Sequence, residues 1–233
     1  MQQLDNKLPS ACMYTILNSR NKVNNLTFSQ DSSLLACALA NSTIKIWSLT
    51  FQKLKMYKSP EDLQKIDKNS FDIYDKVLTE RNCPDNFYFE GHSGPVFGLS
   101  FSPYNDHLLS GAADGSIRLW HLRTNSCISV YKSHVSTVWD VKFCPRGFYF
   151  SSGGNDGVAR IWCVERESPL RHLVGHYSDV YCSTFHPNSN YLATGSSDRS
   201  VRIWDITSGS SVRLFCGFKS EIRSLTFSSD GRF

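Results

Sequence analysis

The stretch Gly175–Asp205, GHYSDVYCSTFHPNSNYLATGSSDRSVRIWD, decides the fold of this chain. It begins with Gly-His and ends with Trp-Asp, and Trp204 follows His176 by 28 positions. The same frame occurs 42 residues earlier, over His134–Trp162, and again 42 residues before that, over His92–Trp120. A 42-residue unit therefore repeats, and the rest of the chain can be compared with it.

Each unit contains short β-rich runs separated by turn signals, as in Val96–Phe101, His107–Ser110 and Ile117–Trp120. Asp-Gly pairs at Gly115 and Gly157 are typical of tight hairpins, because glycine accepts a positive φ without steric cost. Short antiparallel strands repeating about every 40–45 residues, framed by Gly-His and Trp-Asp, are the signature of WD40 propeller blades. We therefore predict an all-β WD40 β-propeller, incomplete, with about four and a half blades of an expected seven.

The repeat frame divides the chain into seven segments. A first, degenerate unit is recognised because Phe28 precedes Trp47 by 19 residues, the gap that also separates Phe101 from Trp120, Phe143 from Trp162 and Phe185 from Trp204. The segments are a lead-in with a possible first strand over 11–17 (1–22), repeat 1 (23–48), an insert (49–90), repeat 2 (91–132), repeat 3 (133–174), repeat 4 (175–216) and a truncated repeat 5 (217–233).

The insert has features of short helices. Ser59-Pro60 is a plausible helix start, with a capping serine and a proline in the first turn. Leu63 and Leu78 are two of several apolar residues that would give amphipathic helical turns. A loop this long is functional or simply a solvated excursion from one rim, and its sequence favours neither.

Four polar positions recur at fixed spacing in repeats 2, 3 and 4. A hydroxyl lies ten residues before each tryptophan and an aspartate lies six before it. Together with the histidine they form the sets His92, Ser110, Asp114, Trp120; His134, Ser152, Asp156, Trp162; and His176, Thr194, Asp198, Trp204. We expect each set to be a buried hydrogen-bond network that fixes the packing of its unit. Unit 1 lacks the set, with Cys37 and Asn41, and unit 5 has Phe218 in place of the histidine.

A catalytic role is the alternative interpretation of the same residues, since the Ser, His and Asp of a hydrolase triad are all present. A catalytic site is not normally repeated three times at equal spacing, and the chain has no G-x-S-x-G nucleophile elbow. We therefore expect no enzyme activity.

A candidate interaction rim is formed by the residue just after the apolar residue of the first strand in repeats 2 to 5. These positions hold Phe97, Trp139, Tyr181 and Arg223, and Asp179 lies two residues before Tyr181. Exposed aromatic and arginine side chains are typical anchors of protein interfaces, although such residues also pack beneath loops. Trp139 is the strongest single candidate. The recurring Arg118, Arg160 and Arg202 are expected to be structural or solvated rather than phosphate-binding.

Composition bounds the classes of function. The net charge of +4 is small and scattered, so direct nucleic-acid binding is not expected. No apolar run is long enough to span a membrane, and the N-terminus has no signal-peptide pattern, which favours an intracellular protein. The eight cysteines form no C-x-x-C pair, so we expect reduced thiols, no metal site and no cofactor.

Several stretches resemble one family beyond the shared repeat. FHPNSNYLATGSSDRSVRIWD (185–205), PRGFYFSSGGNDGVARIW (145–162), ESPLRHLVGHYSDV (167–180) and GHSGPVFGLSFSP (91–103) are similar to the WD40 domain of the TBP-associated factor subunit 5 family. This family comprises TFIID subunit 5 and its paralogue in SAGA/PCAF-type complexes. The resemblance covers about residues 7–233. The chain departs from the family at Cys37-Ala38-Leu39, where members tend to have Gly-rich sequence, and in lacking the family's N-terminal dimerisation region.

The resemblance implies a non-enzymatic scaffold in the nucleus that supports RNA polymerase II transcription initiation as a TFIID or SAGA subunit. Its expected partners are protein subunits, including histone-fold TBP-associated factors, with no small-molecule substrate. Two other functions remain open: a substrate-recognition adaptor of the ubiquitin-ligase kind, and a histone-tail reader. Because the fifth unit stops early, we also expect the chain to be a fragment of a longer, seven-bladed product.

Overall fold

The computed structural model describes residues 21–49, 56–57, 78–79 and 86–232. Within these ranges the chain forms strands and turns and no helix. The predicted first strand over 11–17, the helix start at Ser59-Pro60 and the turn at Leu63 lie outside the described residues. Leu78, which we had assigned to a helical turn, instead pairs with Tyr57 in the two-stranded sheet of β4 (Met56–Tyr57) and β5 (Leu78–Thr79).

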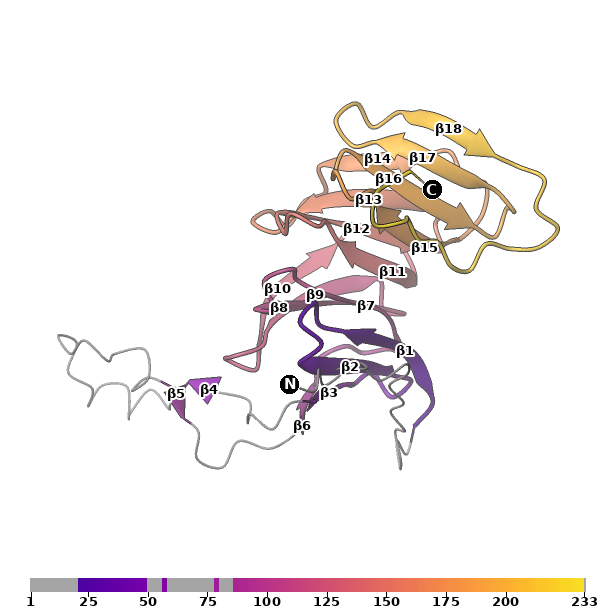
Figure 1. Cartoon of the computed structure of the whole chain (residues 1–233). Helices are drawn as coiled ribbons and strands as arrows, with labels where there is room; N and C mark the ends of the chain where they lie inside the picture. The colour runs from indigo at the N-terminus through magenta and orange to yellow at the C-terminus, as the bar shows by residue number, and fades with distance from the viewer. Residues whose placement is uncertain (1–20, 50–55, 58–77, 80–85, 233) are drawn as a thin grey trace, which may run out of the picture.

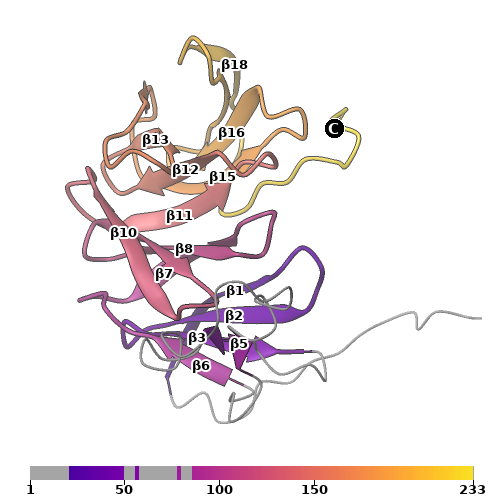
Figure 2. The same ribbon diagram turned by 90° about the vertical axis from the view of Figure 1, so that its left-hand side faces the viewer.

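Four antiparallel four-stranded sheets make up the body of the protein, and they follow one another in chain order from the indigo to the yellow end (Figures 1 and 2). The first contains β1 (Val23–Phe28), β2 (Leu34–Leu39), β3 (Ile44–Ser48) and β6 (Asn86–Phe89). The second contains β7 (Val96–Phe101), β8 (His107–Ala112), β9 (Ser116–His121) and β10 (Ser126–Lys132). The third contains β11 (Val138–Phe143), β12 (Tyr149–Gly154), β13 (Val158–Cys163) and β14 (Arg171–Val174). The fourth contains β15 (Val180–Phe185), β16 (Tyr191–Ser196), β17 (Val201–Asp205) and β18 (Ser211–Phe215).

These sheets are the blades that the repeat predicts, and they do not close into a complete propeller. The first strands β1, β7, β11 and β15 contact one another from sheet to sheet. The second strands are the most buried elements, and every residue of β2 is buried. Apolar side chains of consecutive sheets therefore meet between the sheets, where they form the three main core clusters.

The fourth strand of the first sheet comes from the segment that we had assigned to the insert. β6 pairs with β3 from Ile44–Phe89 to Trp47–Asn86. Phe87 and Phe89 are buried while Tyr88 between them is exposed, which is the alternation of a half-buried strand. The insert interrupts the first sheet between its third and fourth strands. The outer strand therefore does not lie at the distance from β3 that the 42-residue period predicts.

Glycines of the second strands allow consecutive sheets to approach each other. A Cβ on Gly111 would lie 2.7 Å from Cγ1 of Val138, and one on Gly153 would lie 2.8 Å from Cγ1 of Val180. Real Cβ atoms do not come so close to other heavy atoms, so an alanine would force these sheets apart. In the first sheet Ala38 occupies the corresponding position and is fully buried, so the first and second sheets accommodate a Cβ.

Residues 217–232 form no strand, whereas the repeat predicts the start of a fifth unit there. The Ile222 amide donates to the main-chain oxygen of Ser196 in β16 at 3.1 Å, but residues 217–232 form no hydrogen-bonded ladder with a strand of the described residues. Its side chains nevertheless take the positions of a first strand. A Cβ on Gly195 would lie 2.6 Å from Cγ2 of Ile222, as for Gly111 and Gly153 with their valines, and Phe227 contacts the ring of His186.

Candidate functional site

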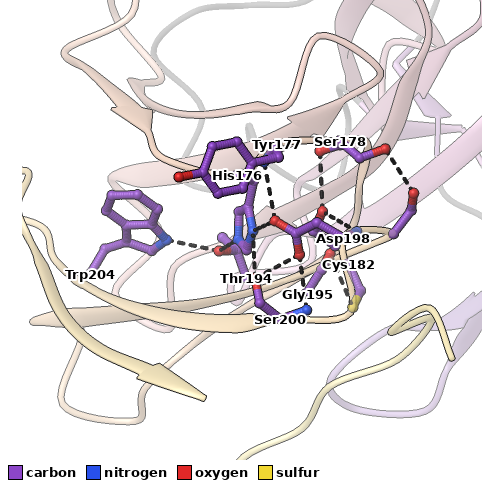
Figure 3. A network of polar contacts seen from close by, with 11 residues as sticks. His176, Tyr177, Ser178, Cys182, Thr194, Gly195, Asp198, Ser200 and Trp204 are labelled. Atoms are coloured by element: carbon purple, nitrogen blue, oxygen red, sulfur yellow. Dashed lines mark hydrogen bonds and ion pairs between the residues drawn. The ribbon is translucent and has the colours of Figure 1, made fainter. Parts of the chain in front are cut away.

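The fourth sheet contains a continuous chain of buried polar contacts (Figure 3). Nε1 of Trp204 donates to Oγ1 of Thr194 at 2.8 Å, and that oxygen lies 2.8 Å from Nε2 of His176. Nδ1 of His176 lies 2.9 Å from the Asp198 carboxylate. Ser200 donates from Oγ to the other oxygen of Asp198 at 2.6 Å. The four repeating positions thus form one network from the core to the hairpin.

Counting donors fixes the protonation of this network. Thr194 has a single hydroxyl proton, which it can donate to Nε2 of His176 while its oxygen accepts from Trp204. Nδ1–H of His176 is then free to donate to Asp198. Burial lowers the pKa of His176 below its ordinary value of 6.5 and so favours the neutral ring that this arrangement needs. Burial alone raises the pKa of Asp198, but hydrogen bonds from Ser200 and His176 outweigh it and lower the pKa to about 2.

The second sheet repeats the same network with serine in place of threonine. His92 lies 2.7 Å from Oγ of Ser110 and 3.1 Å from Asp114, and Trp120 donates to Ser110 at 2.8 Å. Ser116 corresponds to Ser200, since its hydroxyl donates to Asp114 at 2.7 Å. Burial also lowers the pKa of His92. The structure therefore brings together the polar residues that the spacing singles out in this unit.

The third sheet has the same four network residues, but a different side chain bonds to its aspartate. The contacts that it shares with the other sheets are His134–Ser152 at 2.7 Å, Trp162–Ser152 at 2.9 Å and His134–Asp156 at 3.1 Å. Val158 stands where the other units have a serine, and Nη1 of the buried Arg160 contacts Asp156 at 2.7 Å and Nδ1 of His134 at 2.6 Å. A guanidinium thus replaces the missing hydroxyl and helps to hold the Asp156 pKa well below its ordinary value, against the effect of burial.

The other two recurring arginines have a different role. The guanidinium carbons of Arg118 and Arg202 lie 5.9 Å from the ring centroids of Trp120 and Trp204. Both arginines therefore cover the edge of a network by cation–π contact, and the third enters its network directly. These contacts lie within the sheets, and the structural rather than phosphate-binding role of the three arginines stays a prediction.

None of these hydroxyls is accessible as a nucleophile. Ser110, Ser152 and Thr194 have no solvent exposure, and the histidine side chains of the three networks are at most 1% exposed. A substrate could not reach these groups without unfolding of a sheet. Among the described residues no cluster of His, Cys, Asp and Glu could hold a metal ion, and no helix could cross a membrane.

The predicted rim residues form a stack of rings across three sheets. Phe97 contacts Trp139 at a centroid distance of 4.8 Å, and Trp139 contacts Tyr181 edge to face at 5.6 Å. Arg223 lies over the ring of Tyr181 at 5.9 Å. Each ring comes from the second residue of a first strand, so the repeat places them side by side. All three are half-buried, and we refer to Phe97, Trp139 and Tyr181 as the ring stack.

Polar groups hold the central ring of the stack in place. Nε1 of Trp139 donates to the Asp179 carboxylate at 3.1 Å. With its nitrogen turned toward Asp179, the Asn155 amide lies 2.7 and 2.8 Å from the two carboxylate oxygens. Arg223 is also bonded to Glu221 at 3.1 Å. Polar contacts therefore hold the ring stack in place, with a carboxylate at its edge.

A buried carboxylate that we did not single out joins the third and fourth sheets. Asp140 accepts from the Ser183 amide at 2.8 Å and from the Ser183 hydroxyl at 3.2 Å. Burial raises the Asp140 pKa. Its signal in the sequence is an aspartate between the apolar residues Trp139 and Val141 of a first strand, in the position that Gly98 and Cys182 occupy in the neighbouring units.

The residues outside the three networks follow a different pattern. Cys37 is buried in β2, and burial raises its thiol pKa to about 11. Asn41 accepts from Thr43 within its own hairpin. Phe218 is 46% exposed. The first sheet and residues 217–232 therefore make no such network, and other bonds join them to the next sheet. Asn24 and Asn25 donate to the main-chain oxygens of Val96 and Phe97, at 2.9 and 2.8 Å, and the Ile222 amide donates to the main-chain oxygen of Ser196 at 3.1 Å.

Comparison with known proteins supplies two findings. The family model described as WD domain, G-beta repeat matches residues 10–48, 84–121, 125–163 and 167–205. The chain is 48% identical over 126 residues to a Drosophila melanogaster protein named transcription initiation factor TFIID subunit 5, covering 54% of this chain and 18% of that protein.

Two further relatives have related names. The Schizosaccharomyces pombe SAGA complex/transcription factor TFIID complex subunit Taf5 is 40% identical over 124 residues, covering 53% of this chain and 16% of that protein. The Mus musculus TAF5-like RNA polymerase II p300/CBP-associated factor-associated factor 65 kDa subunit 5L is 42% identical over 120 residues, covering 49% of this chain and 20% of that protein. The chain thus spans about a fifth of the length of these relatives.

Proposed function

Because the chain belongs to the WD domain, G-beta repeat family, we propose that it is a non-enzymatic protein-interaction subunit of a TFIID- or SAGA-type complex. In this role it supports RNA polymerase II transcription initiation in the nucleus, and its partners are other protein subunits, including histone-fold TBP-associated factors. The names of its relatives from fly, fission yeast and mouse support this proposal.

The ring stack is the observation from which we assign the docking surface to particular residues. Three half-buried aromatic side chains cross three consecutive sheets, and the Trp139 indole is fixed by its bond to Asp179. Rigid aromatic side chains lose little conformational entropy on binding and often dominate the energy of an interface. We propose that a protein partner docks over Trp139 and Tyr181.

Substitution of Trp139 provides the test. Tagged chain carrying Trp139→Ala should retain less than about a tenth of the histone-fold subunits that the unsubstituted chain captures from nuclear extract, the loss typical of a hot-spot residue. Trp139→Phe keeps an aromatic ring beside Phe97 and Tyr181 and should retain most of the capture. The readout is quantitative mass spectrometry of the captured proteins.

Tyr88→Ala is the matched control, because Tyr88 is a half-exposed aromatic residue on the outer strand of the first sheet. It should leave capture unchanged, and thermal unfolding of each variant should show that the chain remains folded. Full capture by a folded Trp139→Ala chain would refute the docking surface.

The second candidate is a histone-reading adaptor, and one contact favours it. Arg223 already lies over Tyr181 with the Asp179 carboxylate nearby, so the ring stack can accept a cation. A basic histone-tail peptide that binds the chain and loses affinity in Tyr181→Ala would support this candidate. A substrate-recognition adaptor has no comparable observation in its favour.

A further inference from the structure

A cavity of about 330 Å³ lies between the third and fourth sheets, at the opposite end of the strands from the ring stack. Trp139 lies near the start of β11, and the turn that follows β11 lines the cavity. The strand between them has six residues, so the two sites are about 20 Å apart. They cannot be parts of one small binding site.

The floor of the cavity is apolar. Cys144 and Ile161 are each 1% exposed, and Ile206 packs against the same core cluster. Leu170, immediately before β14, lines the cavity beside them. An apolar side chain of a ligand can therefore be buried here.

The rim of the cavity carries two cations without an acidic partner. Arg171 donates only to main-chain oxygens, those of Leu170 at 3.0 Å and Thr207 at 3.5 Å. The Arg146 side chain is exposed, and no carboxylate in the part of the chain that the structure describes pairs with either arginine. The nearby Asp205 carboxylate is bonded to the amide and hydroxyl of Thr207, at 2.8 and 2.6 Å.

A buried hydroxyl at the same site lacks a partner. Oγ of Ser189 lines the cavity, is buried, and has no hydrogen-bond partner. Buried polar groups are normally satisfied, so this oxygen is available to a ligand.

The interface between the second and third sheets shows that the fold does not require two arginines and a serine beside such a cavity. The equivalent cavity between the second and third sheets has a volume of about 390 Å³. Moving back 42 residues, Arg146 becomes Tyr104, Ser189 becomes Gly147, Asn190 becomes Phe148 and Thr207 becomes Glu165. One architecture thus occurs twice with different charged side chains, since Arg146 and Arg171 line one cavity while Glu165 and no arginine line the other.

We propose that the cavity between the third and fourth sheets binds an acidic peptide segment of a partner protein. A carboxylate of the peptide lies between Arg146 and Arg171, where charge-assisted and bidentate hydrogen bonds are available. The adjacent apolar side chain of the peptide enters over Ile161 and Ile206, and Ser189 bonds to the peptide. The apolar floor favours a peptide over a nucleic-acid backbone. This proposal uses a site remote from the ring stack and does not depend on it.

The test measures binding of a fluorescein-labelled peptide, acetyl-GADLFDEAG-amide, to the full chain by fluorescence anisotropy. Arg146→Gln and Arg171→Gln should each weaken binding at least about tenfold, which is the effect of losing one charge-assisted hydrogen bond. Arg213→Gln removes the same charge from the exposed strand β18 and should leave binding unchanged. Thermal unfolding of each variant checks that it is folded.

Four results would overturn the proposal. The first is no binding of the acidic peptide. The second is equal binding of a control peptide in which the acids are replaced by their amides. The third is equal weakening by Arg213→Gln. Competition by single-stranded oligonucleotide that depends on Arg146 and Arg171 and exceeds that of the peptide would assign the site to phosphate and would also refute a peptide site.

Discussion

At the scale of single residues, one hydroxyl in each network serves two neighbours. Thr194 connects Trp204 to His176 with two bonds of 2.8 Å in a region without solvent. Removing a shared buried hydroxyl leaves two polar groups unpaired, which costs more than the loss of one exposed bond.

Thr194→Val therefore should lower the free energy of unfolding by about 1–3 kcal/mol, with little change in shape. Thr226→Val is the matched control, since Thr226 is exposed and bonds only to the adjacent main chain, and its effect should stay within about 0.5 kcal/mol. Urea unfolding followed by tryptophan fluorescence measures both. Equal effects of the two substitutions would show that the network does not stabilise the fold.

Sequence spacing could identify the four network positions because they recur with the period of the fold. It could not identify the role of Arg160, since that role depends on the absence of a hydroxyl at Val158 and on a side chain long enough to reach His134. Asp140 was missed for a similar reason. Its partner, Ser183, lies 43 residues away in the next sheet.

At the scale of elements, the packed interfaces between consecutive sheets, here called seams, determine which substitutions are tolerated. The three nearest atoms to a Cβ on Gly111 would all belong to side chains, those of Val138 and Val141. At Gly153 the main-chain oxygen of Val180 would also lie 2.9 Å away. The two seams should therefore respond differently when the neighbouring valine is shortened.

Gly111→Ala and Gly153→Ala should each lower the free energy of unfolding by about 1–3 kcal/mol, as overpacked cores do. Adding Val138→Ala removes the nearest clashing atom at Gly111. The double variant should therefore lose less free energy of unfolding than the sum of the losses in the two single variants. Adding Val180→Ala to Gly153→Ala should give no such compensation, because the main-chain oxygen remains. Additive behaviour at both seams would contradict this explanation.

The elements themselves were predictable where turns and strands recur, and the prediction failed where the period breaks. β6 was hidden because 37 residues separate it from β3, whereas successive strands elsewhere follow short turns. The ring stack was predictable as three equivalent positions. The ring-to-ring contacts and the bond from Trp139 to Asp179 depend on the distance between sheets, which a periodic pattern does not contain.

At the scale of the whole molecule, the three networks give stability a common dependence on pH. Burial lowers the pKa of His92, His134 and His176 below 6.5, so between the folded and unfolded pKa values the unfolded chain binds more protons. Stability from these groups is present above pH 6.5 and is lost as the pH falls below that value. Asp114 and Asp198, with pKa values of about 2, should lose their contribution later, as the pH falls from 3.8 toward 2.

The free energy of unfolding should therefore decline in two steps on acidification, the first below about pH 6.5 and the second below about pH 3.8. Urea unfolding at a series of pH values from 8 to 3 measures this. His176→Gln removes one of the three histidines and should reduce the first step. A constant free energy of unfolding between pH 7.5 and 5.5 would be inconsistent with neutral buried rings.

The close contacts between second-strand glycines and the next sheet have one more consequence. The extensive contacts between sheets in the described residues all join consecutive sheets, so the free energy of the molecule resembles that of a linear chain with nearest-neighbour coupling. In such a chain a weakened coupling lowers the opening free energy of the two units that share it. Amide exchange in Gly153→Ala should accordingly rise in the third and fourth sheets while protection in the first sheet is unchanged.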